Sequence, residues 1–341
     1  MNVKNVKAVI MAGGRGSRLM PITKNIPKPL VPVCNRPVIN YTFDLLAKHN
    51  INDVTATVCY MPEAIIKEIT NYNAQRTSKL NFKFCVENEP LGTAGSVRQA
   101  ADKTGSPVLV ISGDALTDIN LTEMLILHMA SGAAATMAVK RVSDPSLYGV
   151  VVTDESGYVS TFVEKPPVDE APSDLVNCGI YVLEPEILEC IPPGAGYDFA
   201  RNLFPYMLEN GYKIMTYADN SFYWCDIGNA DALYEANMDL LHKARNTKFK
   251  IQNGGRIKNN VLVGRDAYIS SDVRLGKNVV LGDRVSVRGR VFLSDCIVMN
   301  DTYADFDCAG GVIVSNDYVV RVRTNDRLRP AAGGLQLDFI R

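Results

Sequence analysis

Two kinds of hydrophobic pattern divide the chain near residue 250. Up to about residue 245, short apolar runs alternate with stretches in which apolar residues recur every three or four positions. The runs predict strands at 7–12, 54–59, 82–86 and 107–112, and the stretches predict amphipathic helices at 38–50, 62–72, 93–103 and 121–131. This alternation is typical of βαβ units, so we expect an α/β domain with a Rossmann-like, doubly wound and mostly parallel sheet.

Between residues 134 and 183 the predicted strands follow one another without helices, at 136–140, 149–153, 159–162 and 178–183. We expect them to make the sheet a mixed one and to lie over the carboxyl ends of the first strands, where open α/β sheets bind ligands. Such an extension would serve as a lid over a second substrate. Helical patterns return at 200–210 and 229–245, and the second is expected to end the domain.

A period of six residues governs the last part of the chain. One column of apolar or small residues comprises Val261, Ala267, Val273, Val279, Val285, Val291 and Ile297, and the other Val263, Ile269, Leu275, Leu281, Val287, Leu293 and Met299. Gly264, Gly276 and Gly282 follow the second column, where turns are needed. Hexapeptide repeats predict a parallel β-helix, in which stacked coils bury one another. We therefore expect a first domain at 1–245, a β-helix domain at 246–330 and a tail at 331–341.

The composition excludes several classes of protein. The 341 residues are 47% hydrophobic and 21% charged, with a formal net charge of −1, so no overall field attracts nucleic acid or an anionic membrane. The eight cysteines include no C-x-x-C pair, which favours buried thiols in a reducing compartment over a zinc site. The apolar run near the amino terminus is too short for a signal sequence, so we expect a cytoplasmic protein.

A glycine-rich loop follows the first predicted strand. Its glycines allow the backbone to turn its N–H groups toward a phosphate, and Arg15 and Arg18 add positive charge. The same sequence also suits an ordinary tight connection between a strand and a helix. It is not a Walker loop, and it lacks the last glycine of the dinucleotide fingerprint, which disfavours an oxidoreductase. Lys28, held between Pro27 and Pro29, is a second candidate for binding phosphate.

These motifs resemble the signature of the sugar-1-phosphate nucleotidylyltransferases. The matching segments are residues 13–19 of the loop, Pro21-Ile22-Thr23 and Lys28-Pro29-Leu30, with Ser17 and Met20 where the family often has Thr and Arg. Many members carry a left-handed β-helix after the catalytic domain, so the resemblance covers essentially the whole chain. It implies a nucleotide-diphospho-sugar transferase fold followed by a left-handed parallel β-helix of hexapeptide repeats.

The resemblance also implies a set of site residues. Arg15 and Lys28 would be catalytic, and Asp114 and Asp226 would bind Mg²⁺. The nucleotide would contact Ala12, Gly13, Gly14, Gly16, Ser17, Arg18, Glu87, Pro90, Gly92 and Thr93. The sugar phosphate would contact Gly149, Glu164, Lys165 and Asn177. Taken singly, each could have a purely structural role, but their order and spacing together favour the site.

The implied reaction joins a hexose 1-phosphate to a nucleoside triphosphate and releases pyrophosphate. The attacking phosphate oxygen is already anionic, so no general base is required, and none of the three histidines lies in a candidate motif. A carboxylate at Glu87 can accept two hydrogen bonds from guanine, whereas uracil or thymine offers it only one donor. This favours GTP. The overall pattern, including residues 90–95 and the β-helix, also resembles the mannose-1-phosphate guanylyltransferases, which implies mannose 1-phosphate and GTP as substrates and GDP-mannose as product.

Other functions stay open. One is a glucose-1-phosphate uridylyl- or thymidylyltransferase, and another is a non-catalytic regulatory subunit that binds nucleotide sugars. An acyltransferase role for the β-helix is disfavoured because no histidine follows His242 to act as a base. We expect the β-helix to serve in homo-oligomer assembly or regulation.

Overall fold

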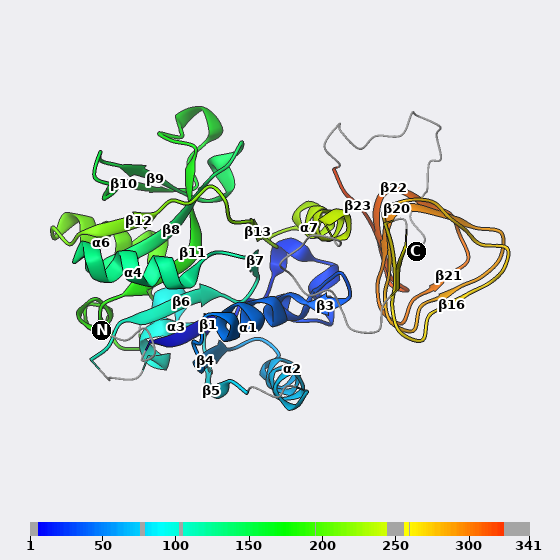
Figure 1. Ribbon diagram of the computed structural model, residues 1–341, viewed down its shortest axis with the longest axis horizontal. Helices are drawn as coiled ribbons and strands as arrows, with labels where there is room; N and C mark the ends of the chain where they lie inside the picture. Colours follow the sequence, from blue (N-terminus) through cyan, green and yellow to red (C-terminus); the bar gives the residue numbers. More distant parts are fainter. Residues whose placement is uncertain are drawn as a thin grey trace. The chain divides into compact units, whose positions relative to one another are not determined.

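The computed structural model describes residues 6–75, 79–101, 105–194, 196–243, 256–258 and 260–323. The chain forms two compact units (Figure 1), of which the first comprises residues 1–32 and 36–228 and the second 33–35 and 229–341. The boundary between the two units lies before helix α7 (Ala230–Lys243), whereas the domain boundary expected from the sequence pattern lies after it.

A nine-stranded sheet forms the centre of the first unit (Figure 1). Its main path runs β10-β9-β11-β6-β1-β4-β5, and β8 pairs with both β11 and β12. The strands are β1 (Lys7–Met11), β4 (Asp53–Val58), β5 (Asn81–Val86), β6 (Val108–Ser112), β8 (Ala135–Arg141), β9 (Gly149–Thr153), β10 (Val159–Glu164), β11 (Leu175–Leu183) and β12 (Ile214–Tyr217). The pairs β1–β4, β1–β6 and β4–β5 are parallel, and β11 is antiparallel to β6, β8 and β9, which confirms the expected mixed sheet.

Helices cover both faces of this sheet, as a doubly wound fold requires. Along β1, Ala8 and Ile10 belong to one hydrophobic cluster and Val9 to another, because successive side chains of a strand point to opposite faces. The first cluster includes α1 (Val38–Lys48), α2 (Pro62–Ala74) and α4 (Leu121–Ser131). The second includes α3 (Gly92–Ala100), α5 (Pro185–Glu189) and α6 (Phe204–Glu209).

Most expected helices form with bounds close to those of the pattern, and the helix at 121–131 has the expected ends. The expected helix at 200–210 consists of a π-helical turn (Phe199–Leu203) that continues into α6. The last residues of the helix expected at 93–103 lie outside the described residues.

The expected extension of the sheet is a continuation of the main sheet. Residues Ile180 to Leu183 of β11 pair with β6, while Val176, nearer the start of β11, pairs with Val150 of β9 beyond the carboxyl end of β6. The register of β11 against β8 shifts between Asn177 and Tyr181, where Gly179 has a φ of 72°. The hairpin of β9 and β10 therefore extends the sheet past the carboxyl end of β6, because one long strand serves both parts.

Parallel stacked coils form the second unit (Figure 1). Strand residues pair in parallel with residues three hexapeptides later, as Val261 with Val279, Tyr268 with Ser286 and Arg274 with Phe292. This register is the one that three six-residue sides per coil produce, so the hexapeptide pattern builds a parallel β-helix. The stacked strands are β15 (Val261–Val263), β16 (Tyr268–Ile269), β17 (Arg274–Leu275), β18 (Val279–Leu281), β19 (Ser286–Val287), β20 (Phe292–Val298), β21 (Tyr303–Ala304) and β22 (Cys308–Val314).

The prediction of two hexapeptide columns is wrong at their last members, Ile297 and Met299. Val279 pairs with Cys296 and Leu281 with Val298, so this coil is one residue shorter than the one before it. A shift of one residue turns every side chain of a strand to the other face. Accordingly Cys296 and Val298 belong to the core of the β-helix.

Ile297 lies instead on the other face of these strands, where it is buried together with Leu262, Val280 and Ile313. Helix α7 contacts β22 within the same unit. Antiparallel strands β14 (Arg256–Lys258) and β23 (Val319–Arg321) pair with β15 and β22. None of the described helices has the length and hydrophobicity that a membrane crossing requires.

Candidate active site

Two aspartates from distant parts of the sequence meet in the first unit. Asp114 lies in the turn between β6 and β7 (Ala115–Thr117), and Asp226 ends β13 (Trp224–Asp226). Strands β7 and β13 pair antiparallel with Asp226 opposite Ala115, and the N–H of Ile227 donates to the carbonyl of Asp114 at 3.2 Å. A two-stranded ribbon therefore brings the two expected metal ligands together.

The ammonium of Lys28 lies between these carboxylates. It forms an ion pair with Asp114 Oδ2, and its Nζ is 3.4 Å from Asp226 Oδ1. Lys28 begins a 3₁₀ turn after Pro27 and is only 8% exposed. The structure thus places one buried cation in contact with two carboxylates.

Burial and charge act in opposite directions on the pKa values of this cluster. Burial acts to raise the pKa of Asp114, but the attraction of Lys28 and hydrogen bonds from Lys28 and Ser112 outweigh it and lower that pKa. For Asp226, burial together with repulsion from Asp114 keeps the pKa above its usual value, despite Lys28 and Arg18. Burial would lower the pKa of Lys28, yet both carboxylates raise it. The lysine is therefore charged in the folded protein.

The glycine-rich loop connects β1 to a 3₁₀ turn (Ser17–Leu19), not to an α-helix. Gly16 has a φ of 69°, and a side chain there would lie 3.0 Å from Cβ of Lys28 and 3.1 Å from Cγ2 of Thr23. Thr23 Oγ1 donates to the carbonyl of Gly16 at 2.7 Å. The loop therefore packs directly on the aliphatic part of Lys28.

Four other residues of the loop are exposed and open to a ligand. Gly14, Arg15, Ser17 and Arg18 are exposed, Ala12 is buried, and a Cβ at Gly14 would have no neighbour within 4 Å. The Arg15 guanidinium lies 5.6 Å from the ring centre of Tyr60. Arg18 lies near Asp226, since a Cβ at Gly228 would be 2.9 Å from Asp226 Oδ2 and 3.5 Å from the Arg18 guanidinium. Positive charge and open backbone thus border the carboxylate pair.

Glu87 follows β5 and is 7% exposed. Its Oε2 accepts the N–H of Leu91 at 3.2 Å, whereas its Oε1 is buried and has no hydrogen-bond partner among the described residues. The same Oε1 lies 3.7 Å from the position of a Cβ at Gly13. A buried carboxylate oxygen without a donor therefore faces the glycine-rich loop, although leaving such a group unpaired is costly.

Gly92 and Thr93 have structural contacts. A Cβ at Gly92 would lie 2.6 Å from the carbonyl oxygen of Tyr197, and that oxygen accepts the N–H groups of Ala94 and Gly95. Thr93 Oγ1 donates to Asp198 Oδ2 at 2.8 Å. These bonds fix the start of α3, so nucleotide contacts from Gly92 and Thr93, and from the exposed Pro90, stay predictions.

The expected sugar-phosphate residues gather at the β9–β10 hairpin and β11. Gly149 is opposite Glu164, and a side chain at Gly149 would overlap the ring of Phe162. Lys165, with a φ of 50°, pairs through Nζ with Glu164 Oε1 at 3.3 Å and has a side chain 45% exposed. Asn177 donates to the hydroxyl of Tyr181 at 2.8 Å.

An aromatic contact connects this group to the carboxylates. The ring centres of Tyr148 and Trp224 are 5.2 Å apart, and Trp224 lies in the same strand as Asp226. Burial and the nearby Asp226 raise the pKa of Tyr148 to about 12. The fold therefore brings the expected phosphate, metal and sugar residues to one region.

A sequence profile described as Nucleotidyl transferase matches residues 7–243. The chain belongs to the nucleotidyl transferase family. Among the curated relatives of this nucleotidyl transferase, a UTP–glucose-1-phosphate uridylyltransferase of Synechocystis sp. is 36% identical over 70% of this chain and 64% of its own length, slightly under two thirds. Mannose-1-phosphate guanyltransferases of Schizosaccharomyces pombe and Saccharomyces cerevisiae are 35% and 33% identical over 77% and 76% of the chain, and 73% and 71% of their own lengths. These matches confirm the resemblance to sugar-1-phosphate nucleotidylyltransferases.

Solved structures agree in fold. HddC from Yersinia pseudotuberculosis, in complex with GMP-PN, superposes with a TM-score of 0.59 at 24% identity and covers 69% of this chain and 99% of its own. A putative glucose-1-phosphate thymidylyltransferase from Bacillus anthracis gives a TM-score of 0.62 at 24% identity and covers 72% of this chain and 97% of its own. The likeness supports the fold of the nucleotidyl transferase unit.

Several residues of this nucleotidyl transferase site carry no signal in the sequence. Ser112 donates a hydrogen bond to Asp114. Tyr197 and Asp198 hold the start of α3. Each acts through a contact between segments far apart in the chain, which a linear pattern does not reveal.

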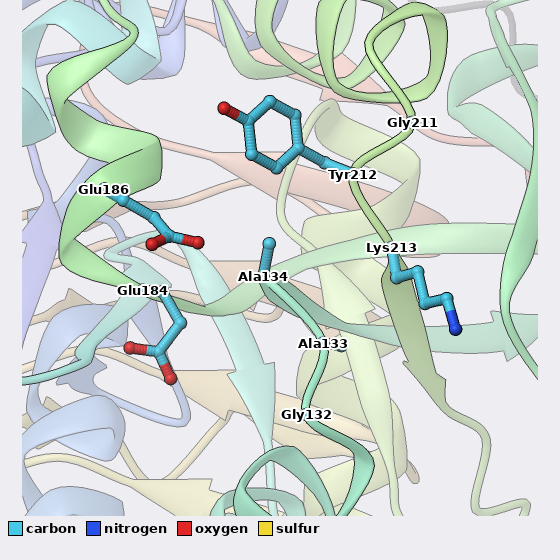
Figure 2. A pocket seen from close by; sticks show the side chains of 8 residues that line it. All are labelled: Gly132, Ala133, Ala134, Glu184, Glu186, Gly211, Tyr212 and Lys213. Atoms are coloured by element: carbon cyan, nitrogen blue, oxygen red, sulfur yellow. The ribbon is translucent and has the colours of Figure 1, made fainter.

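Two cavities lie near the sheet. One of about 610 Å³ borders Glu87 and Leu91 and the α3 residues Gly95 and Arg98. The other, of about 390 Å³, lies where β11 ends and β8 and β12 begin, and Figure 2 shows Glu184, Glu186, Tyr212 and Lys213 around it. β11 ends beside Val108, at the start of β6, whereas Asp114 follows the end of β6. The second cavity therefore lies at the opposite end of these strands from Asp114.

Proposed function

We propose that this nucleotidyl transferase joins mannose 1-phosphate to GTP, giving GDP-mannose and pyrophosphate. The observation that carries the choice of base is the free Oε1 of Glu87, buried beside Gly13. The names of the fungal relatives, which align over about three quarters of this chain, support the same substrates.

Hydrogen-bond chemistry explains why this oxygen favours guanine. Guanine presents N1–H and the N2 amino group side by side, so a carboxylate can accept two hydrogen bonds from it. Uracil presents one N3–H flanked by two carbonyl oxygens, which would face a carboxylate without a donor. A site that sets a carboxylate oxygen against a carbonyl oxygen of the ligand discriminates against that ligand, because both groups are acceptors.

The remaining residues would position and neutralise phosphates. The exposed backbone of the glycine-rich loop would donate to the triphosphate, with Arg15 and Lys28 stabilising the charge that develops as pyrophosphate leaves. Lys165, with an exposed ammonium, would bind the sugar phosphate, and its phosphate oxygen would attack the α-phosphorus in line. No residue has to remove a proton from this nucleophile, because it is already anionic.

The carboxylate pair fits a magnesium ion. Mg²⁺ is commonly held by one or two carboxylates together with substrate phosphates and water. Asp114 and Asp226 offer such a pair, already holding the cationic group of Lys28 between them, and among the described residues no cluster of three His, Cys, Asp or Glu forms a complete protein cage. When bound, Mg²⁺ would neutralise phosphate charge in the transition state.

Gly149, Glu164 and Asn177 would line the sugar site. The hairpin of β9 and β10 sets Gly149 opposite Glu164, so a carboxylate stands beside a position without a side chain. Glu164 can accept hydrogen bonds from sugar hydroxyls. Asn177 keeps one amide hydrogen for a ligand after its bond to Tyr181.

Release of pyrophosphate tests this function directly. Purified protein with Mg²⁺ would be offered each of the four ribonucleoside triphosphates and dTTP, with mannose 1-phosphate or glucose 1-phosphate. We expect release with GTP and mannose 1-phosphate. Release only with UTP or dTTP and glucose 1-phosphate would establish the second candidate, a uridylyl- or thymidylyltransferase, which the cyanobacterial relative supports. If no pair of substrates released pyrophosphate, the result would favour a regulatory subunit that only binds nucleotide sugars.

The remaining proposals concern organisation. We propose a catalytic domain over 1–245 and a β-helix domain over 246–330 that serves assembly into a homo-oligomer. We also propose a cytoplasmic location, supported by eight cysteines that form no disulfide, four of them buried. The net charge of −1 supports a partner set without nucleic acid or membrane.

A further inference from the structure

We propose that Lys28 occupies the metal position in the metal-free protein, and that its ammonium leaves for the triphosphate when the metal binds. The proposal rests on the metal site of the proposed function but not on its choice of base or sugar. It makes Lys28 a switch that couples metal loading to binding of the phosphates.

The first support is the position of the ammonium. Lys28 Nζ bonds Asp114 Oδ2 and lies 3.4 Å from Asp226 Oδ1, so it occupies the space between the oxygens that would bind a metal. Mg²⁺ lies only about 2.1 Å from each ligand oxygen. A metal shared by both carboxylates would therefore stand within touching distance of Nζ, with two positive centres side by side. Lys28 has to leave before both carboxylates can bind the metal.

The second support is the way in which the lysine stem is held. A Cβ at Gly16 would lie 3.0 Å from Cβ and 3.3 Å from Cγ of Lys28, so the first part of the side chain is packed against the glycine-rich loop. The outer part can rotate about its remaining bonds while this stem stays in place. The stem packs on the loop where the triphosphate would bind, while the ammonium contacts the carboxylates, so the side chain lies between the two sites.

The third support is electrostatic. Without a cation, Asp114 and Asp226 would be two carboxylates in a mostly buried site, where like charges repel strongly and each charge has lost part of its hydration. The single positive charge of Lys28 offsets only one of these two negative charges. A divalent ion offsets both, which releases the lysine to offset phosphate charge instead. More charge is therefore compensated once metal and triphosphate are both bound, and this favours the exchange.

Binding of Mn²⁺ without any nucleotide tests the proposal. Free Mn²⁺ would be measured by electron paramagnetic resonance during titration of wild type and of Lys28→Met, which keeps the length of the side chain and removes its charge. We expect Lys28→Met to bind Mn²⁺ at least tenfold more tightly, because the competing cation is gone. Lys24→Met, which removes an exposed lysine four residues earlier, should change the affinity less than twofold.

Thermal unfolding gives a second readout that needs no activity. Lys28→Met should unfold at a lower temperature than wild type without metal, because its two carboxylates repel each other, and Mn²⁺ should restore it by a larger shift than in wild type. Equal or weaker Mn²⁺ binding by Lys28→Met would overturn the proposal. So would tight binding that survives Asp226→Asn, because the ion would then lie elsewhere. Pyrophosphate release from other substrate pairs would refute the proposed function and leave these measurements unchanged.

Discussion

Replacing Glu87 with Gln tests the assignment of the base most directly. The change keeps the size of the side chain, and its remaining carbonyl oxygen can still accept the N–H of Leu91, so the fold should be retained. The free Oε1 becomes an amino group, which meets a guanine donor with another donor. A hydrogen bond to a charged group contributes about 1.5–3 kcal/mol, which corresponds to a loss of about 10- to 150-fold in kcat/KM for GTP.

The same variant should treat pyrimidines differently. A glutamine amide offers a donor and an acceptor, which match a carbonyl oxygen and the N3–H of uracil. The ratio of kcat/KM for GTP to that for UTP should therefore fall by at least the loss for GTP alone. Initial rates of pyrophosphate release with each nucleotide give both numbers.

A matched control is Glu155→Gln, which removes an exposed carboxylate in the turn between β9 and β10. It should leave both nucleotides within about twofold of wild type, as expected for a surface change. The reasoning would be refuted if Glu87→Gln left kcat/KM for GTP within threefold of wild type, because the free oxygen would then not contact the base.

Three further changes test other parts of the argument. Asp226→Ala should lower kcat by about two to three orders of magnitude while circular dichroism stays native, and a variant with most of its Mg²⁺-dependent activity would remove Asp226 from the site. Gly92→Ala should lower the free energy of unfolding by more than about 2 kcal/mol, because a methyl group at a φ of 71° would also clash with the Tyr197 carbonyl. The control Gly211→Ala has a φ of 76° and no neighbour within 4 Å, so its free energy of unfolding should fall by only about 1–2 kcal/mol. Equal decreases for the two variants in urea titrations would contradict the clash. Burial lowers the pKa of His128 from 6.5, so the unfolded chain binds the proton more readily than the folded protein. The free energy of unfolding should therefore fall as the pH drops below about 6.5. If the urea midpoint of a His128→Gln variant depends on pH as it does in wild type, this histidine is not the cause.

The strand and helix order of the first unit could be predicted because its periodicity is local. The helix at 121–131 has the bounds that its apolar spacing indicates, and Gly132 in the left-handed conformation ends it. The expected extension of the mixed sheet forms, because β11 is long enough to pair with β6 at one end and with β9 at the other. A hydrophobic pattern indicates that a strand exists but not with which strands it pairs.

The β-helix shows the same limit within a strict repeat. The period of six predicts the coils as far as Leu293, which lies in the core. It fails at Ile297 because the coil that ends there contains one residue fewer, and the pairing of Val279 with Cys296 decides which face turns inward. An apolar residue on either face satisfies the sequence pattern, since both faces are buried there.

The sequence by itself determined the two-part organisation, the glycine-rich loop and the types of residue that the chemistry needs. Only the tertiary structure decided that Asp114, Asp226 and Lys28 form one buried cluster, because the β7–β13 ribbon and the packing of Gly16 on Lys28 bring them together. It also showed that one oxygen of Glu87 lacks a partner within the described part of the chain, while the other accepts the N–H of Leu91. Local structural preferences depend on neighbouring residues of the sequence. Charge compensation and hydrogen bonding depend instead on the distances in space between residues that are far apart in the sequence.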